Sequence, residues 1–271
     1  MKSKGKPVIP KNGWGLDRMP ARNVLMPYRL LREHVVRYIF ASYYAENKTV
    51  LDIACGSGYG ASYLLSKGAK SIVGGDASKE AIHDAIEFYK KDNLEFILLD
   101  ATKMPICDNH FEVIVSFETI EHIPEYEKFL SECQRILDHD GIFICSTPNV
   151  IIPGSEKAVN PYHVNEFNVK QIDEILHKYF SKIELFGEGL RGEEKPSLKQ
   201  KLANLIKDKL LWVPFMDKII RFITRFIMKE FRLLTLNEVA DFDSLWDEKN
   251  KPALLNDPSL VPHNIIAIAY K

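Results

Sequence analysis

Residues 50–60 read Val-Leu-Asp-Ile-Ala-Cys-Gly-Ser-Gly-Tyr-Gly and constrain the fold of this chain more than any other stretch. An apolar run ends near an acidic residue, three glycines follow at alternate positions, and a helical pattern begins at Ala61. Glycine suits such a place because the backbone must turn sharply and a ligand must approach bare main chain. The stretch therefore predicts a strand, a tight turn and a helix N-terminus that together hold a nucleoside-type cofactor.

Two kinds of cofactor are compatible with this turn. Gly56, Gly58 and Ala61 fit the dinucleotide fingerprint Gly-x-Gly-x-x-Ala, so an NAD-dependent oxidoreductase is one interpretation. Asp52 favours the other, because a carboxylate at the strand end repels a pyrophosphate and attracts a cationic ligand.

The whole string from Val50 to Gly60 closely resembles the first motif of class I methyltransferases that depend on S-adenosylmethionine (SAM). SAM carries an ammonium and a sulfonium, which agrees with an acid near its methionine end. The resemblance implies SAM as the cofactor, bound in part by Asp52, Ala54, Gly56 and Gly58.

Short apolar segments alternate with helical patterns along the next hundred residues. This alternation predicts a parallel sheet covered on both faces, with ligands bound beyond the carboxyl ends of its strands. The predicted strands are 48–54, 71–75, 94–99, 112–117, 142–145 and 264–270, and the predicted helices are 24–44, 61–66, 79–91, 125–137 and 169–180. We expect Gly68 and Gly141 to end helices.

Acidic residues close the second and third strands of this pattern. Asp76, followed by Ala77, can accept both hydroxyls of an adenosine ribose, although it could instead cap the next helix, as Ser78 could. Asp100 and Ala101 are implied by the resemblance to contact the adenine edge, and an ordinary loop aspartate is the alternative.

The fourth strand runs into Val115-Ser-Phe-Glu-Thr-Ile-Glu-His-Ile-Pro124, which resembles the methyltransferase segment that borders the transferred methyl group. Phe117 and Glu118 are therefore expected to contact the cofactor. With a helix beginning at Pro124, Glu121 and His122 lie on the preceding loop and could orient a substrate hydroxyl or remove its proton. A histidine that only hydrogen-bonds the backbone is the alternative for His122.

Ser146-Thr-Pro-Asn149 and Asn160-Pro-Tyr-His-Val-Asn-Glu-Phe167 resemble a branch of the family found in sugar, polysaccharide or quinone pathways. Their amide, imidazole and carboxylate groups suit a polyhydroxyl or anionic acceptor. His163 competes with His122 as the base, unless it caps the helix that follows.

A long segment separates the last two predicted core strands, where family members usually have a short hairpin. Residues 195–235 carry ten Lys or Arg against three acids. From Lys218 to Arg232 basic residues recur on one helical face and apolar ones on the other, after an apolar stretch at 210–216. This pattern predicts either contact with an anionic membrane surface through 210–234, or a lid or homodimer face.

Composition narrows the remaining options. The net charge is −1 and no nucleic-acid motif accompanies the basic segment, so no nucleic-acid partner is expected. Four scattered cysteines lack metal-ligand spacing, and we expect reduced cysteines and no metal site. Without an apolar leader or an apolar run of about 20 residues, we expect a cytoplasmic protein, peripheral to the inner face of the membrane if the segment binds lipid.

The sequence thus predicts an α/β fold, a seven-stranded Rossmann-like methyltransferase sheet whose last strand is antiparallel. Its predicted parts are an arm and cap helix at 1–47, a SAM-binding core at 48–186, a basic helical insertion at 187–262 and a final core strand at 263–271. The expected function is SAM-dependent O-methylation of a small-molecule, sugar or glycolipid hydroxyl. An NAD-dependent oxidoreductase and a non-catalytic SAM-fold subunit remain the alternatives.

Overall fold

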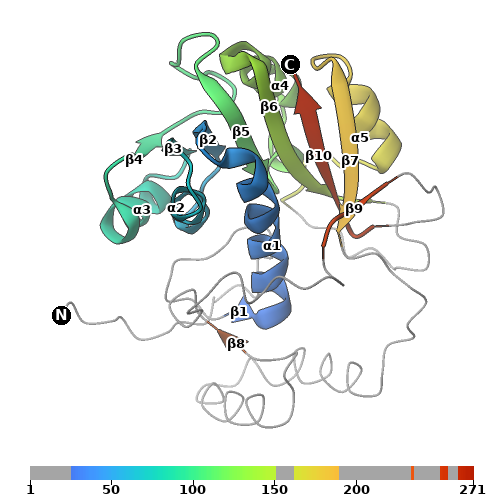
Figure 1. The fold of residues 1–271 in the computed structure, drawn as a ribbon. Coiled ribbons are helices and arrows are strands. Elements are labelled where there is room, and N and C mark those ends of the chain that lie inside the picture. The colour runs from blue at the N-terminus through green and yellow to red at the C-terminus, as the bar shows by residue number, and fades with distance from the viewer. Residues whose placement is uncertain (1–25, 151–161, 189–232, 235–250, 256–261) are drawn as a thin grey trace.

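A central sheet of eight strands organises the protein in a computed structural model that describes residues 26–150, 162–188, 233–234, 251–255 and 262–271 (Figure 1). The strand order is β4-β3-β2-β5-β6-β10-β7-β9. The strands are β2 (Thr49–Ile53), β3 (Ser71–Asp76), β4 (Leu94–Leu98), β5 (Phe111–Phe117), β6 (Leu137–Pro148), β7 (Lys182–Glu188), β9 (Ala253–Leu254) and β10 (Asn264–Tyr270).

Strands β4, β3, β2, β5 and β6 are parallel, whereas β10 lies between β6 and β7 and is antiparallel to both. This arrangement confirms the predicted parallel core and the antiparallel strand at 264–270. Two strands have no counterpart among the predicted ranges: β7, which brings the sheet to the expected seven strands, and the two-residue β9, which pairs with β7 and adds an eighth.

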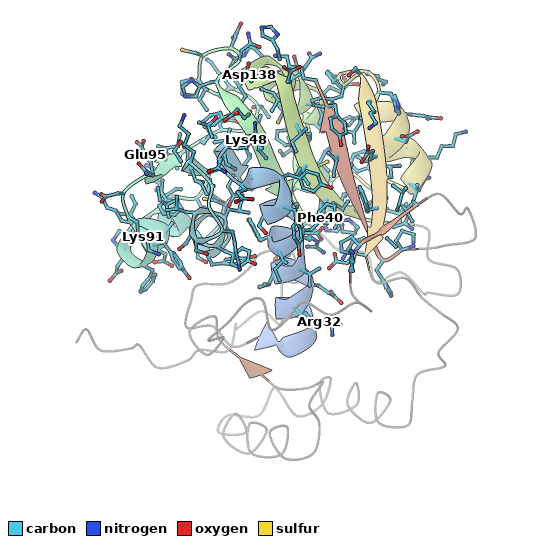
Figure 2. The ribbon with its side chains drawn as sticks, in the orientation of Figure 1. Arg32, Phe40, Lys48, Lys91, Glu95 and Asp138 are labelled. Atoms are coloured by element: carbon cyan, nitrogen blue, oxygen red, sulfur yellow. The ribbon has the colours of Figure 1, made fainter. Side chains whose placement is uncertain are left out.

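Helices cover both faces of the sheet (Figure 1). One face carries α1 (Tyr28–Ala45), α2 (Tyr59–Ser66) and α3 (Lys79–Tyr89), and the other carries α4 (Tyr126–Ile136) and α5 (Val169–Leu176). Neighbouring strand residues point to opposite faces, so Val50 joins the first core and Leu51 the second. Side chains fill both layers, and the Phe40 ring lies 5.0 Å from the Phe186 ring between α1 and β7 (Figure 2).

The boundary between α4 and β6 differs from the prediction. The helix ends at Ile136 and the strand begins directly at Leu137, so Gly141 lies inside β6 and is not a helix stop. A Cβ at Gly141 would come within 2.7 Å of Leu137 Cγ, so packing of the strand explains this glycine. Gly68, with φ of 96°, does follow the end of α2 as predicted.

Several predicted features lie outside the described residues: the arm at 1–23 and most of the basic insertion, including 210–216 and the basic helix at 218–232. The short strand β8 (Leu233–Leu234) is described and pairs antiparallel with β1 (Met26–Pro27), directly before α1. Among the helices that the structure describes, none combines the length and the hydropathy of a membrane span.

Candidate active site at the carboxyl edge of the sheet

The glycine turn joins the carboxyl end of β2 to α2, as the sequence predicted. Ala54, Gly56 and Gly58 all have positive φ angles, of 60°, 55° and 83°. A Cβ on Gly56 would meet nothing within 4 Å, so a ligand can approach the backbone there. A Cβ on Gly58 would instead lie 2.7 Å from the Phe96 ring, so packing below the turn requires that glycine.

Asp52 lies beneath the turn and has no exposed surface. Its two carboxylate oxygens are each 3.2 Å from the Tyr38 hydroxyl, which donates to them. Burial raises the pKa of Asp52 to about 8, and the charge of Asp76 adds to this shift. The cofactor contact predicted for Asp52 stays a prediction, from a side chain that is fully buried in this structure.

Asp76 connects the ends of two strands. Its Oδ2 accepts a hydrogen bond from the Gly56 backbone N–H at 2.9 Å, and its Oδ1 accepts from Ser78 N–H at 2.8 Å. The cap of α3 is Ser78, whose hydroxyl accepts from Ala81 N–H at 3.2 Å. The helix-cap alternative therefore belongs to Ser78, and each Asp76 oxygen keeps a lone pair that a ribose hydroxyl could use.

Asp100 is exposed beyond the end of β4. Its Oδ1 accepts from the Thr102 N–H at 2.8 Å and from the Thr102 hydroxyl at 2.7 Å, and these bonds lower the pKa of Asp100. Ala101 is half-buried and Ala77 is exposed at the same edge. The structure thus places these residues at the ends of adjacent strands, while only Asp76 bonds the glycine turn.

Glu118 follows β5 with a φ of 51°. Its Oε1 accepts from the Ser146 hydroxyl at 2.9 Å and lies 3.5 Å from Arg37 Nη1. Arg37 is 2% exposed, and its Nε donates to Glu188 at 2.9 Å. Phe117 is buried, with its ring 5.0 Å from the Tyr38 ring.

Glu121, His122 and His163 meet at the same edge of the sheet, although they come from separate segments. The first two lie in a 3₁₀ turn (Ile120–His122) and α4 begins only at Tyr126, so the predicted loop and helix start at Pro124 are wrong in detail. One ligand-type atom from each of the three residues lies within 4.8 Å of the others, and the two imidazole rings are 5.0 Å apart. The cap of α5 is Asn168 and not His163.

Glu121 is the most unusual member of this group. It is 1% exposed, and its carboxylate has no hydrogen-bond partner among the residues that the structure describes. The Thr147 hydroxyl approaches it without hydrogen-bond geometry. Burial, with a contribution from Glu118, raises the pKa of Glu121 well above its usual range.

The sequence analysis gave no individual role to several residues that shape this site, although the last two stand in motifs that it singled out: Arg37, Tyr38, Thr147 and Asn165. Arg37 lies in the core beside the buried Val36 and Tyr38. Asn165 donates from Nδ2 to Ile123 O at 2.7 Å and so ties the 162–165 segment to the 3₁₀ turn. A half-buried amide of this kind has no periodic signature in the sequence.

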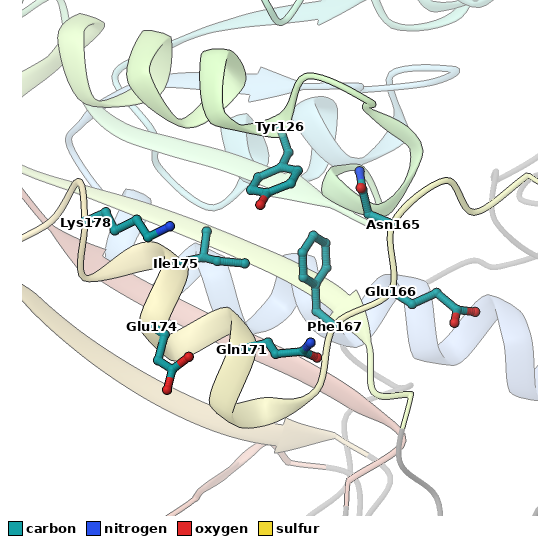
Figure 3. A pocket seen from close by; sticks show the side chains of 8 residues that line it. All are labelled: Tyr126, Asn165, Glu166, Phe167, Gln171, Glu174, Ile175 and Lys178. Carbon is teal, nitrogen blue, oxygen red and sulfur yellow. The ribbon is translucent and has the colours of Figure 1, made fainter.

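A cavity of about 310 Å³ lies between α4 and α5, away from the glycine turn (Figure 3). Tyr126, Phe167 and Ile175 form its apolar part, and Gln171, Glu174 and Lys178 its polar rim. Asn165 also borders the cavity, and it lies in the same segment as His163.

Residues 51–145 match the methyltransferase-domain family. A probable SAM-dependent methyltransferase from Mycolicibacterium smegmatis is 33% identical over 147 residues, which is 54% of this chain and 56% of the relative. A fatty-acid O-methyltransferase from the same species is 32% identical over 117 residues, covering 42% and 43% of the two chains. The chain thus spans about half the length of the curated relatives it matches.

Solved structures show the same fold at low identity. A SAM-dependent methyltransferase from Archaeoglobus fulgidus aligns with a TM-score of 0.54 at 17% identity, over 90% of this chain and 94% of that one. The [4+2]-cyclase SpnF aligns with a TM-score of 0.55 at 15% identity, over 90% and 82%. The sheet topology is that of the class I methyltransferase fold, residues 51–145 within it match a methyltransferase domain, and the relatives that match this region are described as S-adenosylmethionine-dependent.

Proposed function

We propose that the protein transfers the methyl group of SAM to an oxygen atom of a small-molecule acceptor of the lipid or sugar type. The observation that carries the proposal is the position of the Glu121, His122 and His163 group on the same sheet edge as the open glycine turn. The fatty-acid O-methyltransferase supports a lipid acceptor. So does a phthiotriol/phenolphthiotriol dimycocerosates methyltransferase from Mycobacterium tuberculosis, 33% identical over 97 residues, or 35% of this chain and 36% of that one.

The placement of the cofactor residues supports the following roles for them. Gly56 leaves room for the methionine end of SAM, Asp76 accepts the ribose hydroxyls, and Asp100 with Ala101 contacts the adenine. Phe117 and Glu118 border the methyl group. When bound, SAM supplies a methyl group on a sulfonium leaving group, so the protein mainly aligns the acceptor and excludes water.

An alcohol or sugar hydroxyl must also lose its proton as it attacks. His122 Nδ1 lies 2.9 Å from Tyr162 O, and only a protonated nitrogen can donate to this carbonyl. The proton on Nδ1 leaves a lone pair on Nε2, which makes His122 the favoured base, with His163 as the second candidate and Glu121 orienting the hydroxyl.

The basic insertion supports a lipid-phase acceptor by its composition, since 195–235 has ten basic residues and three acids. We expect the full chain to float with anionic liposomes, and to lose this binding when Phe222, Phe226 and Phe231 are changed to Ser. Unchanged flotation of that variant would remove membrane contact from the proposal.

Methyl transfer is tested with the purified full chain, labelled SAM and a panel of fatty acids, lipid alcohols and sugars. We expect SAM and S-adenosylhomocysteine, but not NAD, to raise the melting temperature. His122→Ala or His163→Ala should lower turnover about a hundredfold for whichever residue is the base. His83→Ala, in an exposed site on α3, is the matched control. Binding of NAD without binding of SAM would overturn the proposed methyl transfer. Full turnover in both His122→Ala and His163→Ala would overturn the proposed base.

A further inference from the structure

We propose that Glu121, His122 and His163 bind a divalent transition-metal cation beside the cofactor. The cation site itself can be measured without any acceptor, whereas its use in catalysis rests on the function proposed above. Two imidazole nitrogens and one carboxylate oxygen are a donor set that zinc and iron enzymes use, with positions left open for substrate or water.

The geometry of the three donors carries the first step of the argument. One ligand-type atom from each residue lies within 4.8 Å of the other two, so a single ion can reach all three after small side-chain adjustments. The imidazole rings are 5.0 Å apart and inclined at 74°, which keeps them from stacking against each other.

His122 is oriented as a ligand would be. Its Nδ1 lies 2.9 Å from the Tyr162 backbone oxygen, and a bond to that carbonyl fixes the proton on Nδ1 and the lone pair on Nε2. Within the described part of the chain, Nε2 is buried and has no hydrogen-bond partner. Metal-binding histidines commonly donate their second ring nitrogen to a carbonyl in this way.

The backbone holds the two ligand-bearing segments together. Val164 N–H and Asn165 N–H both donate to Glu121 O at 3.0 Å. Asn165 Nδ2 donates to Ile123 O at 2.7 Å. The approach of His163 to Glu121 is therefore set by the hydrogen bonds of the two residues that directly follow it, as a preorganised site requires.

Glu121 supplies an independent observation. A carboxylate with 1% exposure that accepts no hydrogen bond in the described structure is costly to bury unless a positive charge compensates it. The charged neighbours that act on it are Glu118, which makes this cost larger, and Arg37, which offsets part of it. A divalent cation on the Glu121 oxygen would offset it.

The donor set also selects the class of ion. Mg²⁺ and Ca²⁺ prefer oxygen ligands, while two imidazoles favour Zn²⁺, Fe²⁺, Co²⁺ or Mn²⁺. In the proposed reaction the ion would hold the acceptor oxygen and lower the pKa of its hydroxyl. His122 would then be a ligand, and the hydroxyl proton would leave to water.

The test uses the full chain after chelator treatment, titrated with Zn²⁺, Co²⁺ or Mg²⁺ by calorimetry. We expect one equivalent of Zn²⁺ to bind, with at least tenfold weaker binding for Mg²⁺. Glu121→Gln and His163→Ala should each weaken Zn²⁺ binding tenfold or more. His83→Ala removes the exposed His83, Asp84 and Glu87 cluster on α3 and should change nothing.

Cobalt reports ligation directly, because its visible absorption should appear with the wild-type chain and be lost in His163→Ala. SAM binding and circular dichroism show whether each variant is folded. If one of the two variants does not fold, His122→Gln is tested in its place. No Zn²⁺ binding by the wild type, or equal affinity in Glu121→Gln and His163→Ala, would overturn the site. Zinc binding without any methyl transfer would leave the site standing and reject only the proposed function.

Discussion

The two halves of the sheet edge differ in whether their polar side chains are hydrogen-bonded within the protein. On the cofactor edge, formed by the ends of β2, β3 and β4, Asp52, Asp76 and Asp100 all accept hydrogen bonds from the protein. On the proposed acceptor edge, formed by 119–122, Thr147 and 162–165, Glu121 and the Thr147 hydroxyl are buried without a hydrogen-bond partner in the described residues, whereas Thr119 and Asn165 are bonded. Ser57 is the exception on the cofactor edge.

The difference indicates which part of the site is already formed before any ligand arrives. An unpaired buried polar group costs about 1–3 kcal/mol, so a cluster of them is a place where a ligand or ion can restore the lost interactions. The cofactor edge gains little from new partners and contributes to the stability of the fold. Substitutions on the two edges should therefore separate stability from function.

The largest effect is expected where the two edges meet, at Arg37. Arg37→Met leaves Glu188 buried without its cation and should lower the free energy of unfolding by about 3–5 kcal/mol. Urea unfolding measures this loss, and the double variant with Glu188→Gln should recover part of it. A loss under about 1 kcal/mol would show that the pair is not what holds α1 against this edge.

The next effect compares one substitution on each edge. A Cβ at Gly60 would lie 2.0 Å from Tyr38 Cζ, so Gly60→Ala must displace the ring that bonds Asp52. It should cost about 1–3 kcal/mol of unfolding free energy. Glu121→Gln, of similar shape and without a bond to lose, should change it by less than about 1 kcal/mol. Equal losses in both variants would erase the distinction between the edges.

The third effect concerns cofactor affinity. Asp76→Ala removes the acceptor of the Gly56 and Ser78 amides and the proposed ribose contact, and should weaken SAM binding about ten- to a hundredfold. Turnover at saturating SAM should fall less, because ribose contacts are the same before and during transfer. Calorimetry gives the affinity, with the exposed Glu95→Ala as the control. Unchanged affinity in Asp76→Ala would contradict the ribose assignment.

The smallest effect, when it is taken per pH unit, is the pH dependence of stability. Burial raises the pKa of Asp52 to about 8 in the folded protein, against about 3.9 unfolded. The folded state holds the proton more tightly, so this contribution is present below pH about 4 and is lost as pH rises toward 8. One such group changes stability by at most about 1.4 kcal/mol per pH unit.

Asp52→Asn should flatten this slope in urea unfolding between pH 5 and pH 8. Glu188, whose pKa burial raises to about 7, keeps a smaller slope of the same sign in the variant. A variant that retains the full wild-type slope would show that Asp52 is already ionised across this range.

The sequence predicted the sheet well because each strand and helix carries its own local pattern. The alternation that puts Val50 and Leu51 in different cores is visible in the sequence, and so is the glycine turn. The burial of Arg37 was not predicted, because its partners, Glu118 and Glu188, lie far along the chain. For the same reason, the meeting of Glu121 with His163 could not be foreseen, since it depends on backbone bonds between two loops.

The β7–β10 ladder pairs Glu188 with Asn264, so the long segment that joins these strands leaves and re-enters the sheet at neighbouring positions. A tight hairpin could close the same gap, and lengthening such a connection adds only slowly to its entropic cost. The segment also supplies β9, which pairs with β7, and β8, which pairs with β1, so an exchanged segment must replace these two pairings. Exchanging the segment between related enzymes would show whether it determines which acceptor is methylated, independently of the site for the methyl donor.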